Sequence, residues 1–173
     1  PAAGGRAGTL LVNTIIDACV ECADLVTARR YLERARQRGV VDAVSFNTLM
    51  KGLLANGKEA EAHKVLDELA AAGVPATQAS YHGLLHARIL AGDRRASWCL
   101  VDKMIAAGAR PNAVTCSILL KMVTSPGHAA DVPRILNLIE AVDDTVDEVL
   151  LTSVLEACLR TGQLATLSNL LDR

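Results

Sequence analysis

The sequence predicts an all-α protein, an α-solenoid of tandem antiparallel helix hairpins stacked in a right-handed superhelix. Three observations predict this fold. Apolar residues at helical spacing recur with a period of 34 or 35 residues. A glycine that breaks each hairpin recurs with them, at Gly57, Gly92, Gly127 and Gly162. Finally, the interior must be filled by Leu, Val, Ile and Ala, because the chain is 51% hydrophobic but holds only one Trp, two Tyr and one Phe.

The repeat is clearest over residues 43–77. Its first helical segment carries Phe46, Leu49 and Leu53, Asn56-Gly57 breaks the helix, and Val65 and Leu69 continue the apolar spacing in a second segment. The same slots hold similar residues one repeat later and two repeats later: Leu84, Leu85, Leu100, Val101 and Met104, then Leu119, Leu120, Val123, Ile135, Leu136 and Ile139.

In chain order, residues 1–8 are small and are expected to be a flexible segment, followed by repeats at 9–42, 43–77, 78–112 and 113–147 and an incomplete repeat at 148–173. In the first repeat we expect helices near residues 10–22 and 25–38, with Asp24 as N-cap of the second. In the fourth, we expect the second helix to begin late, with Asp131 as its cap and Pro133 in its first turn. We expect the chain to be part of a longer array.

Composition bounds the function. A formal net charge of −1 argues against indiscriminate binding of polyanions, although a local basic strip remains possible. No apolar run is long enough to span a bilayer, so we expect no membrane insertion. Five Cys without a secretory signal indicate a reducing compartment or buried thiols.

Catalytic and metal sites are not expected. Cys19 and Cys22 form a CxxC pair, but Cys19 occupies the core slot that Leu53 holds one repeat later. The residues that could act as nucleophile, base and orienting group do not recur together. We therefore expect no metal, no cofactor, no small-molecule substrate and no enzymatic activity in this chain.

One polar position recurs in the otherwise apolar first helices. It is the fifth residue of each repeat and holds Asn13, Asn47, His82, Ser117 and Thr152. This column is either an ordinary solvated face or a surface that contacts an extended ligand once per repeat. One turn further, the column Asp17, Lys51, His86, Lys121 and Glu156 is basic only in its middle.

The junctions between repeats favour the second alternative. They read DAVSFNTLM over residues 42–50 and RPNAVTCSILL over 110–120. This resembles the pentatricopeptide repeat family, whose junctions have the form Pro-Asp-x-Val-Thr-Tyr-Asn-Thr-Leu-Ile, and the resemblance covers residues 9–173. Tetratricopeptide repeats carry Trp in their first helix, whereas Trp98 falls in a second helix here.

The resemblance implies that single-stranded RNA lies along the concave surface, with one base per repeat. It also implies that the polar residue of each repeat and the last residue of the same repeat recognise the base together, which we call a recognition pair. These pairs are Asn13 with Asp42, Asn47 with Thr77, His82 with Asn112, and Ser117 with Asp147, while Thr152 belongs to the incomplete repeat. Aliphatic residues would sandwich the bases, unless they are simply core residues: Leu10, Val44, Ala79, Val114 and Val149. Lys51 and Lys121 would attract phosphates.

The expected bases follow from the resemblance and from donor and acceptor chemistry. Asp42 can accept from the imide N–H of uracil, Asn47 suits a pyrimidine with cytosine favoured, and Asp147 can accept from the N1–H of guanine; the His82 pair is unassigned. The family also implies a mitochondrial or plastid location and a role in RNA metabolism. The alternative function is a protein-interaction scaffold, because helical solenoids offer concave surfaces to protein subunits as well.

Overall fold

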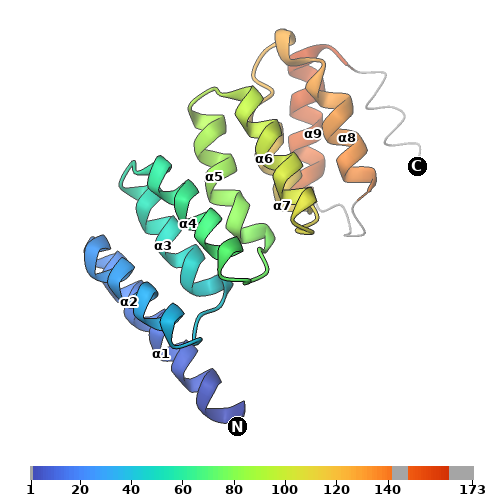
Figure 1. Cartoon of the computed structure of the whole chain (residues 1–173). Helices are drawn as coiled ribbons and strands as arrows, with labels where there is room; N and C mark the ends of the chain where they lie inside the picture. Colours follow the sequence, from blue (N-terminus) through green and yellow to red (C-terminus); the bar gives the residue numbers. More distant parts are fainter. Residues whose placement is uncertain (1, 142–147, 164–173) are drawn as a thin grey trace. The chain divides into compact units, whose positions relative to one another are not determined.

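The computed structural model describes residues 2–141 and 148–163, and it contains helices and no strand within those ranges. The chain is therefore an all-α solenoid of helix hairpins, as the sequence predicts (Figure 1); the handedness of the superhelix stays a prediction. It divides into two compact units, Pro1–Ala87 and Arg88–Arg173. The expected pair residue Asp147 and most of the second helix of the incomplete repeat lie outside the described residues.

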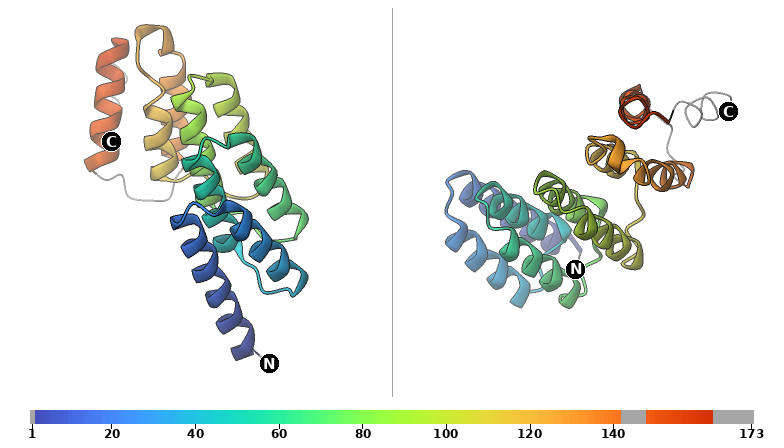
Figure 2. Two further views of the ribbon diagram at one scale, coloured as in Figure 1. Left: turned by 90° about the vertical axis from the view of Figure 1, so that its left-hand side faces the viewer. Right: turned by 90° about the horizontal axis from the view of Figure 1, so that it is seen from above.

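The first unit is built from α1 (Ala2–Glu21), α2 (Leu25–Gln37), α3 (Ala43–Ala55) and α4 (Glu59–Ala71), and from the start of α5 (Gln78–Leu90). Helix α1 packs against α2 and α3, and α3 packs against α4, so consecutive hairpins stack through their first helices. Figure 2 shows the helices of this unit from two further directions. Helices α3 and α5 begin at the first residue of the second and third predicted repeats.

The core of this unit uses the apolar slots that the period predicts. Phe46, Leu49 and Leu53 of α3 and Val65 and Leu69 of α4 are buried. Burial of such side chains contributes about 1.5–3 kcal/mol each, which makes stacking of the hairpins the main source of stability.

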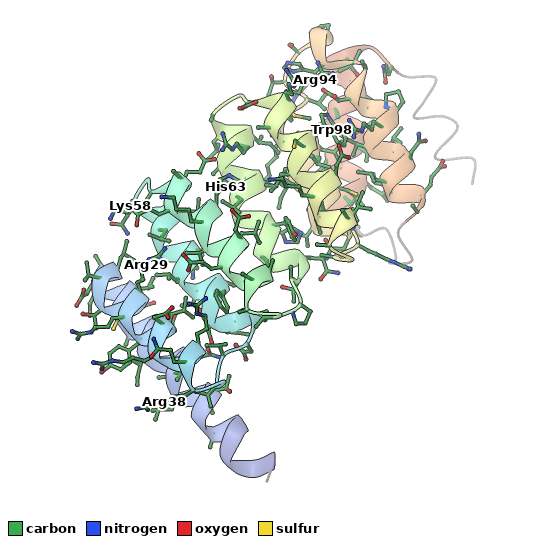
Figure 3. All side chains as sticks on the ribbon, in the orientation of Figure 1. Arg29, Arg38, Lys58, His63, Arg94 and Trp98 are labelled. Atoms are coloured by element: carbon green, nitrogen blue, oxygen red, sulfur yellow. The ribbon has the colours of Figure 1, made fainter. Side chains whose placement is uncertain are left out.

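Glycine permits the closest approach between the first two hairpins. A Cβ added to Gly52 of α3 would lie 2.7 Å from Cγ1 of Val20 and 3.0 Å from Cδ2 of Leu25. At the rim of the same interface, Arg29 of α2 pairs with Glu68 of α4 at 3.0 Å (Figure 3). The cap expected at Asp24 is confirmed, since its side chain accepts from the backbone N–H of Thr27.

Residues 1–8 are expected from the sequence to be a flexible segment, but in the structure α1 already begins at Ala2. Adding residues to a helix that packing already holds is far cheaper than nucleating a new one. Helix α1 therefore extends from its packed part into the small residues that precede it.

The second unit contains α6 (Arg94–Ala106), α7 (Ala113–Leu120), the 3₁₀ turn η1 (Pro126–His128), α8 (Asp131–Glu140) and α9 (Glu148–Thr161). Helix α7 packs against α8 and α9. It ends at Leu120, and Ser125 further on is extended, as expected for the residue before Pro126, where helix is disfavoured.

The prediction that Asp131 caps α8 is wrong, because Ala130 is the N-cap and Asp131 is the first helical residue. Its buried carboxylate instead accepts a hydrogen bond from Trp98 Nε1 at 2.8 Å and forms an ion pair with Nε of Arg94. Arg134 lies over the Trp98 ring, 3.8 Å from its centroid. We call these residues the Trp98 cluster; Arg94 and Trp98 are labelled on α6 in Figure 3. The cluster joins α6 to α8, in the repeat whose helices α7 and α8 are shorter than those of the second repeat.

Candidate RNA interface

The first recognition pair is assembled in the structure. Asn13 is half-buried on α1, and Asp42 is the N-cap of α3, so packing of α1 on α3 brings the two together. Asn13 Nδ2 donates to both carboxylate oxygens of Asp42, at 3.2 and 3.4 Å. The pair is half-buried, which leaves an edge with a donor and an acceptor side by side for a ligand.

The second pair repeats this arrangement with neutral groups. Asn47 Nδ2, on α3, donates to Thr77 Oγ1 at 3.4 Å, and Thr77 directly precedes α5. The distance is longer than in the first pair, and Thr77 offers a hydroxyl where Asp42 offers a carboxylate. Residues 30 positions apart in sequence therefore meet at this junction too.

The third pair falls on both sides of the division between the units, so each member is described by itself. His82 is half-buried on α5, and burial lowers the pKa of its imidazole, which is therefore neutral at pH 7. Asn112 is the N-cap of α7 and accepts from the backbone N–H of Thr115 at 3.0 Å.

In the fourth and fifth repeats only the first member of each pair is described. Ser117 is half-buried on α7, and its expected partner Asp147 lies outside the described residues. Thr152 is exposed on α9, where its hydroxyl donates to the carbonyl of Glu148 at 2.7 Å.

The aliphatic residues expected to sandwich bases are not core residues. The exposed fractions are 68% for Leu10, 53% for Val44, 52% for Val114 and 68% for Val149, and Ala79 is exposed as well. Each lies on a first helix, three residues before the polar residue of the same repeat. Exposed apolar side chains next to polar ones form a suitable surface for the face of a base.

The expected phosphate-attracting residues are exposed. Lys51 lies on α3, and Lys121 is the C-cap of the short α7 rather than part of its body. The acidic ends of the same column, Asp17 and Glu156, are also exposed, and Glu156 pairs with Arg160 at 2.8 Å. The basic character is thus local, as the sequence indicates.

A buried hydroxyl that the sequence reasoning overlooked recurs beside the pairs. Ser45, Ser80 and Thr115 lie at the third residue of α3, α5 and α7, and all three are buried. Ser45 and Thr115 complete capping boxes with Asp42 and Asn112. The sequence shows this recurrence, since a hydroxyl residue occurs at this slot every 35 residues. Its burial could not be predicted, because hydroxyl residues are more often exposed.

No group of three or more potential metal ligands occurs in the described part of the chain. Cys19 is half-buried rather than core, because α1 has only α2 and α3 as principal neighbours, and Cys22 is exposed. Burial raises the pKa of Cys116 to about 11 and also raises that of Cys158, so both thiols stay protonated at neutral pH. Among the described helices none is both long and apolar enough to cross a membrane.

Comparison with known proteins agrees with this geometry. A family model described as "Pentatricopeptide repeat-containing protein" matches residues 55–171, which is more than half of the chain. The chain belongs to the pentatricopeptide repeat family. A pentatricopeptide repeat-containing protein of Arabidopsis thaliana is 30% identical over 169 residues, covering 92% of this chain. Another from the same plant, named as mitochondrial, is 25% identical over 138 residues and covers 79% of this chain.

Solved pentatricopeptide repeat structures share the fold. The protein PPR10 in complex with an 18-nucleotide psaJ RNA element matches with a TM-score of 0.62 and 21% identity, covering 93% of this chain and 24% of that one. The pentatricopeptide repeat domain of Arabidopsis thaliana protein-only RNase P 1, in complex with tRNA, matches with a TM-score of 0.58 and 16% identity, covering 87% of this chain and 98% of that domain. The chain spans 29% and 21% of the lengths of the two curated relatives.

Proposed function

We propose that this chain is a sequence-selective module for single-stranded RNA, with one base bound per repeat, and that it acts in RNA processing in a mitochondrion or plastid. A binding role rather than a catalytic one fits its residues. The proposal extends to partners: single-stranded RNA first, with other protein subunits as further partners in a larger assembly.

One observation carries the proposal. The two members of a recognition pair, about 30 residues apart in sequence, contact each other in both pairs that fall within one unit, Asn13 with Asp42 and Asn47 with Thr77. An ordinary solvated face requires no such pairing. Exposed Leu10 and Val44 lie one turn away from these pairs on α1 and α3, so an apolar surface and a polar edge are presented together.

The comparisons support the same function and location. PPR10 was solved with an RNA element and the protein-only RNase P domain with tRNA, and both share this fold. The mitochondrial name of one relative supports an organelle. By the pairs, the expected bases are uracil, then a pyrimidine with cytosine favoured, an unassigned base, and guanine.

Exchange of one base preference for another tests the proposal. Asn13→Ser recreates, with Asp42, the Ser/Asp pair that Ser117 and Asp147 form in sequence. The small hydroxyl leaves room for a purine, so the base preferred opposite the first repeat should change from uracil to guanine. One good edge contact is worth about 1–3 kcal/mol of discrimination. The measurement is enrichment from a randomised RNA pool at low salt, where weak binding by few repeats is still detected.

Asn47 provides the internal control, because the base opposite the second repeat should be the same for the parent chain and the Asn13→Ser variant. Equal loss of enrichment for all four bases would mean that the polar column is not a recognition surface. Absence of any enrichment by the parent chain would place the scaffold function first.

A specific observation favours that second candidate. Leu151, Leu155 and Leu159 follow one another at four-residue spacing on α9, and all three are exposed. Such a stripe suits an apolar face of a helical protein partner. Leu155→Glu should abolish protein contact through this stripe, measured as association with co-purifying subunits, and should leave RNA enrichment unchanged.

A further inference from the structure

We propose that Ser45 is a positioning residue for base recognition, whose buried hydroxyl fixes the orientation of the Asn13 amide and thereby makes the first repeat prefer uracil over cytosine. The inference rests on the proposed function and adds a residue to it that does not belong to any recognition pair. Ser45 is fully buried at the start of α3, so its hydroxyl is out of reach of a base and acts through Asn13.

The Asn13 amide is held at both of its ends. Ser45 Oγ lies 2.5 Å from Asn13 Oδ1 and 3.2 Å from Asp42 Oδ1, so its single proton is donated to Asn13 by the shorter contact, while Asn13 Nδ2 donates to Asp42. Turning the amide by 180° would place its carbonyl oxygen against the Asp42 carboxylate, where two acceptors repel each other. The Ser45 hydroxyl itself is oriented by the backbone N–H of Asp42, which donates to it at 3.4 Å.

A fixed amide explains discrimination between the two pyrimidines. Nδ2 of Asn13 has a second proton that can be donated to a base carbonyl, and the Asp42 carboxylate can accept from a base N–H. Uracil offers a carbonyl next to its N3–H, which matches this order of groups. Cytosine offers an amino group next to an unprotonated N3, so donor would face donor and acceptor would face acceptor.

The second repeat lacks this fixation. Ser80 occupies the slot of Ser45, but its hydroxyl lies 3.3 Å from Thr77 Oγ1 and accepts from the backbone N–H of Thr77 at 3.1 Å. The Asn47 carbonyl oxygen is buried without a hydrogen-bond partner among the described residues. Because the Thr77 hydroxyl can donate or accept, the Asn47 amide can take either orientation and accommodate either pyrimidine. We therefore expect weaker discrimination at the second repeat.

Ser45→Ala and Ser80→Ala form a matched pair of variants for the test, with Ser45→Thr as the conservative variant, since Thr115 occupies the same slot in the fourth repeat. Each variant is incubated with a randomised RNA pool, and the enrichment of uracil over cytosine is determined opposite each repeat. We expect about tenfold enrichment opposite the first repeat, equivalent to about 1.4 kcal/mol, to fall to about twofold in Ser45→Ala. Ser45→Thr should restore it, and Ser80→Ala should leave it unchanged.

Stability separates positioning from a structural role. Both alanine variants remove a hydroxyl next to a helix N-terminus, so their thermal unfolding should shift by similar amounts. If Ser45→Ala weakens binding to all RNAs in proportion and keeps the uracil-to-cytosine ratio, Ser45 is merely structural and the proposal is overturned.

A second measurement needs no RNA. The side-chain NH₂ of Asn13 should show restricted motion by ¹⁵N relaxation in the parent chain, and this restriction should be lost in Ser45→Ala but kept in Ser80→Ala. An Asn13 amide that is unaffected by Ser45→Ala overturns the inference. If the amide follows Ser45 but the parent chain enriches no RNA, it is the proposed function that fails, and the base preference fails with it.

Discussion

The second and fourth repeats have the same sequence length but different helices. In the second, α3 and α4 each have 13 residues, whereas in the fourth α7 has eight residues, η1 three and α8 ten. Both nevertheless bury the same apolar slots. Leu119 takes the place of Leu49 and Ile135 the place of Val65, and all four side chains are fully buried. The difference teaches that packing slots define the repeat, and that helix length is adjustable when other contacts replace the lost turns.

In the fourth repeat the replacement is the Trp98 cluster, which joins α8 to the preceding hairpin through a buried carboxylate. In the second repeat regular helices approach so closely that Gly52 has no room for a side chain. One repeat thus depends on a polar anchor and the other on close apolar packing.

The largest effect should come from removing the anchor. Trp98→Ala leaves a cavity and deprives the buried Asp131 of its donor, so it should lower the free energy of unfolding by about 3–5 kcal/mol. Urea unfolding followed by far-UV circular dichroism measures this, because the variant has no Trp fluorescence. Trp98→Phe keeps a ring but loses the Nε1 bond and should cost about 1–3 kcal/mol. A cost below that of Trp98→Phe would show that the cluster is not an anchor.

The close packing of the second repeat should break next. Gly52→Ala places a Cβ 2.7 and 2.8 Å from the two γ-carbons of Val20, and overpacking of this kind costs about 1–3 kcal/mol. Gly83→Ala is the control, since its Cβ would meet only the flexible end of Leu54, at 2.9 Å, and Ala gains helix propensity. Equal effects of the two substitutions on urea unfolding would contradict the close-approach interpretation.

One equivalent core slot holds Phe46 in the second repeat and Cys116 in the fourth, and both side chains are fully buried. Only the Cys116 thiol can be titrated, so the pH dependence of stability distinguishes the two repeats. Burial raises the pKa of Cys116 from 9.0 to about 11. The unfolded chain therefore loses this proton first, and stability that is present below pH 9 falls as pH rises towards 11. The loss at pH 10 should be about 1.4 kcal/mol. Cys116→Ala should remove this part of the pH dependence, and an unchanged alkaline slope would show that another group causes it.

The smallest effect concerns a feature that the two repeats share. Asp42 and Asn112 cap the first helices of the second and fourth repeats, α3 and α7, each with a capping box. Asp42→Ala and Asn112→Ala should each cost about 1 kcal/mol, as measured by thermal unfolding. A much larger cost for Asn112→Ala would show that the short α7 depends more on its cap than α3 does.

Much of the fold could be predicted from sequence because the repeat supplies it several times. The slots of Leu49, Leu84 and Leu119 identify one another by their spacing, and all three are buried. The all-α class followed from the same comparison of the chain with itself, whereas the family followed from the resemblance of the junction sequences to the pentatricopeptide repeat. Helix ends were harder, because the start of α1 at Ala2 depends on propagation from packed residues rather than on a local signal.

The candidate site could also be predicted only in part. That Asn13 and Asp42 belong together came from the family resemblance, and the contact between them is a matter of packing between α1 and α3 that spacing alone does not supply. Neither the Asp131 contact with Trp98 nor the Ser45 contact with Asn13 could be predicted. Each joins residues more than 30 positions apart through side-chain geometry.

The double role of Asp42 has a consequence for anyone who wishes to redesign the target of such an array. The side chain that would face a base also caps the helix of the following repeat, and good caps are restricted to Asp, Asn, Ser and Thr. Under the proposed function, only about four residue types can therefore occupy this position, whatever bases must be distinguished. Replacement by Ala or Leu would weaken the next hairpin before it altered any preference. The inner position, Asn13, carries no such obligation and is the one to vary first.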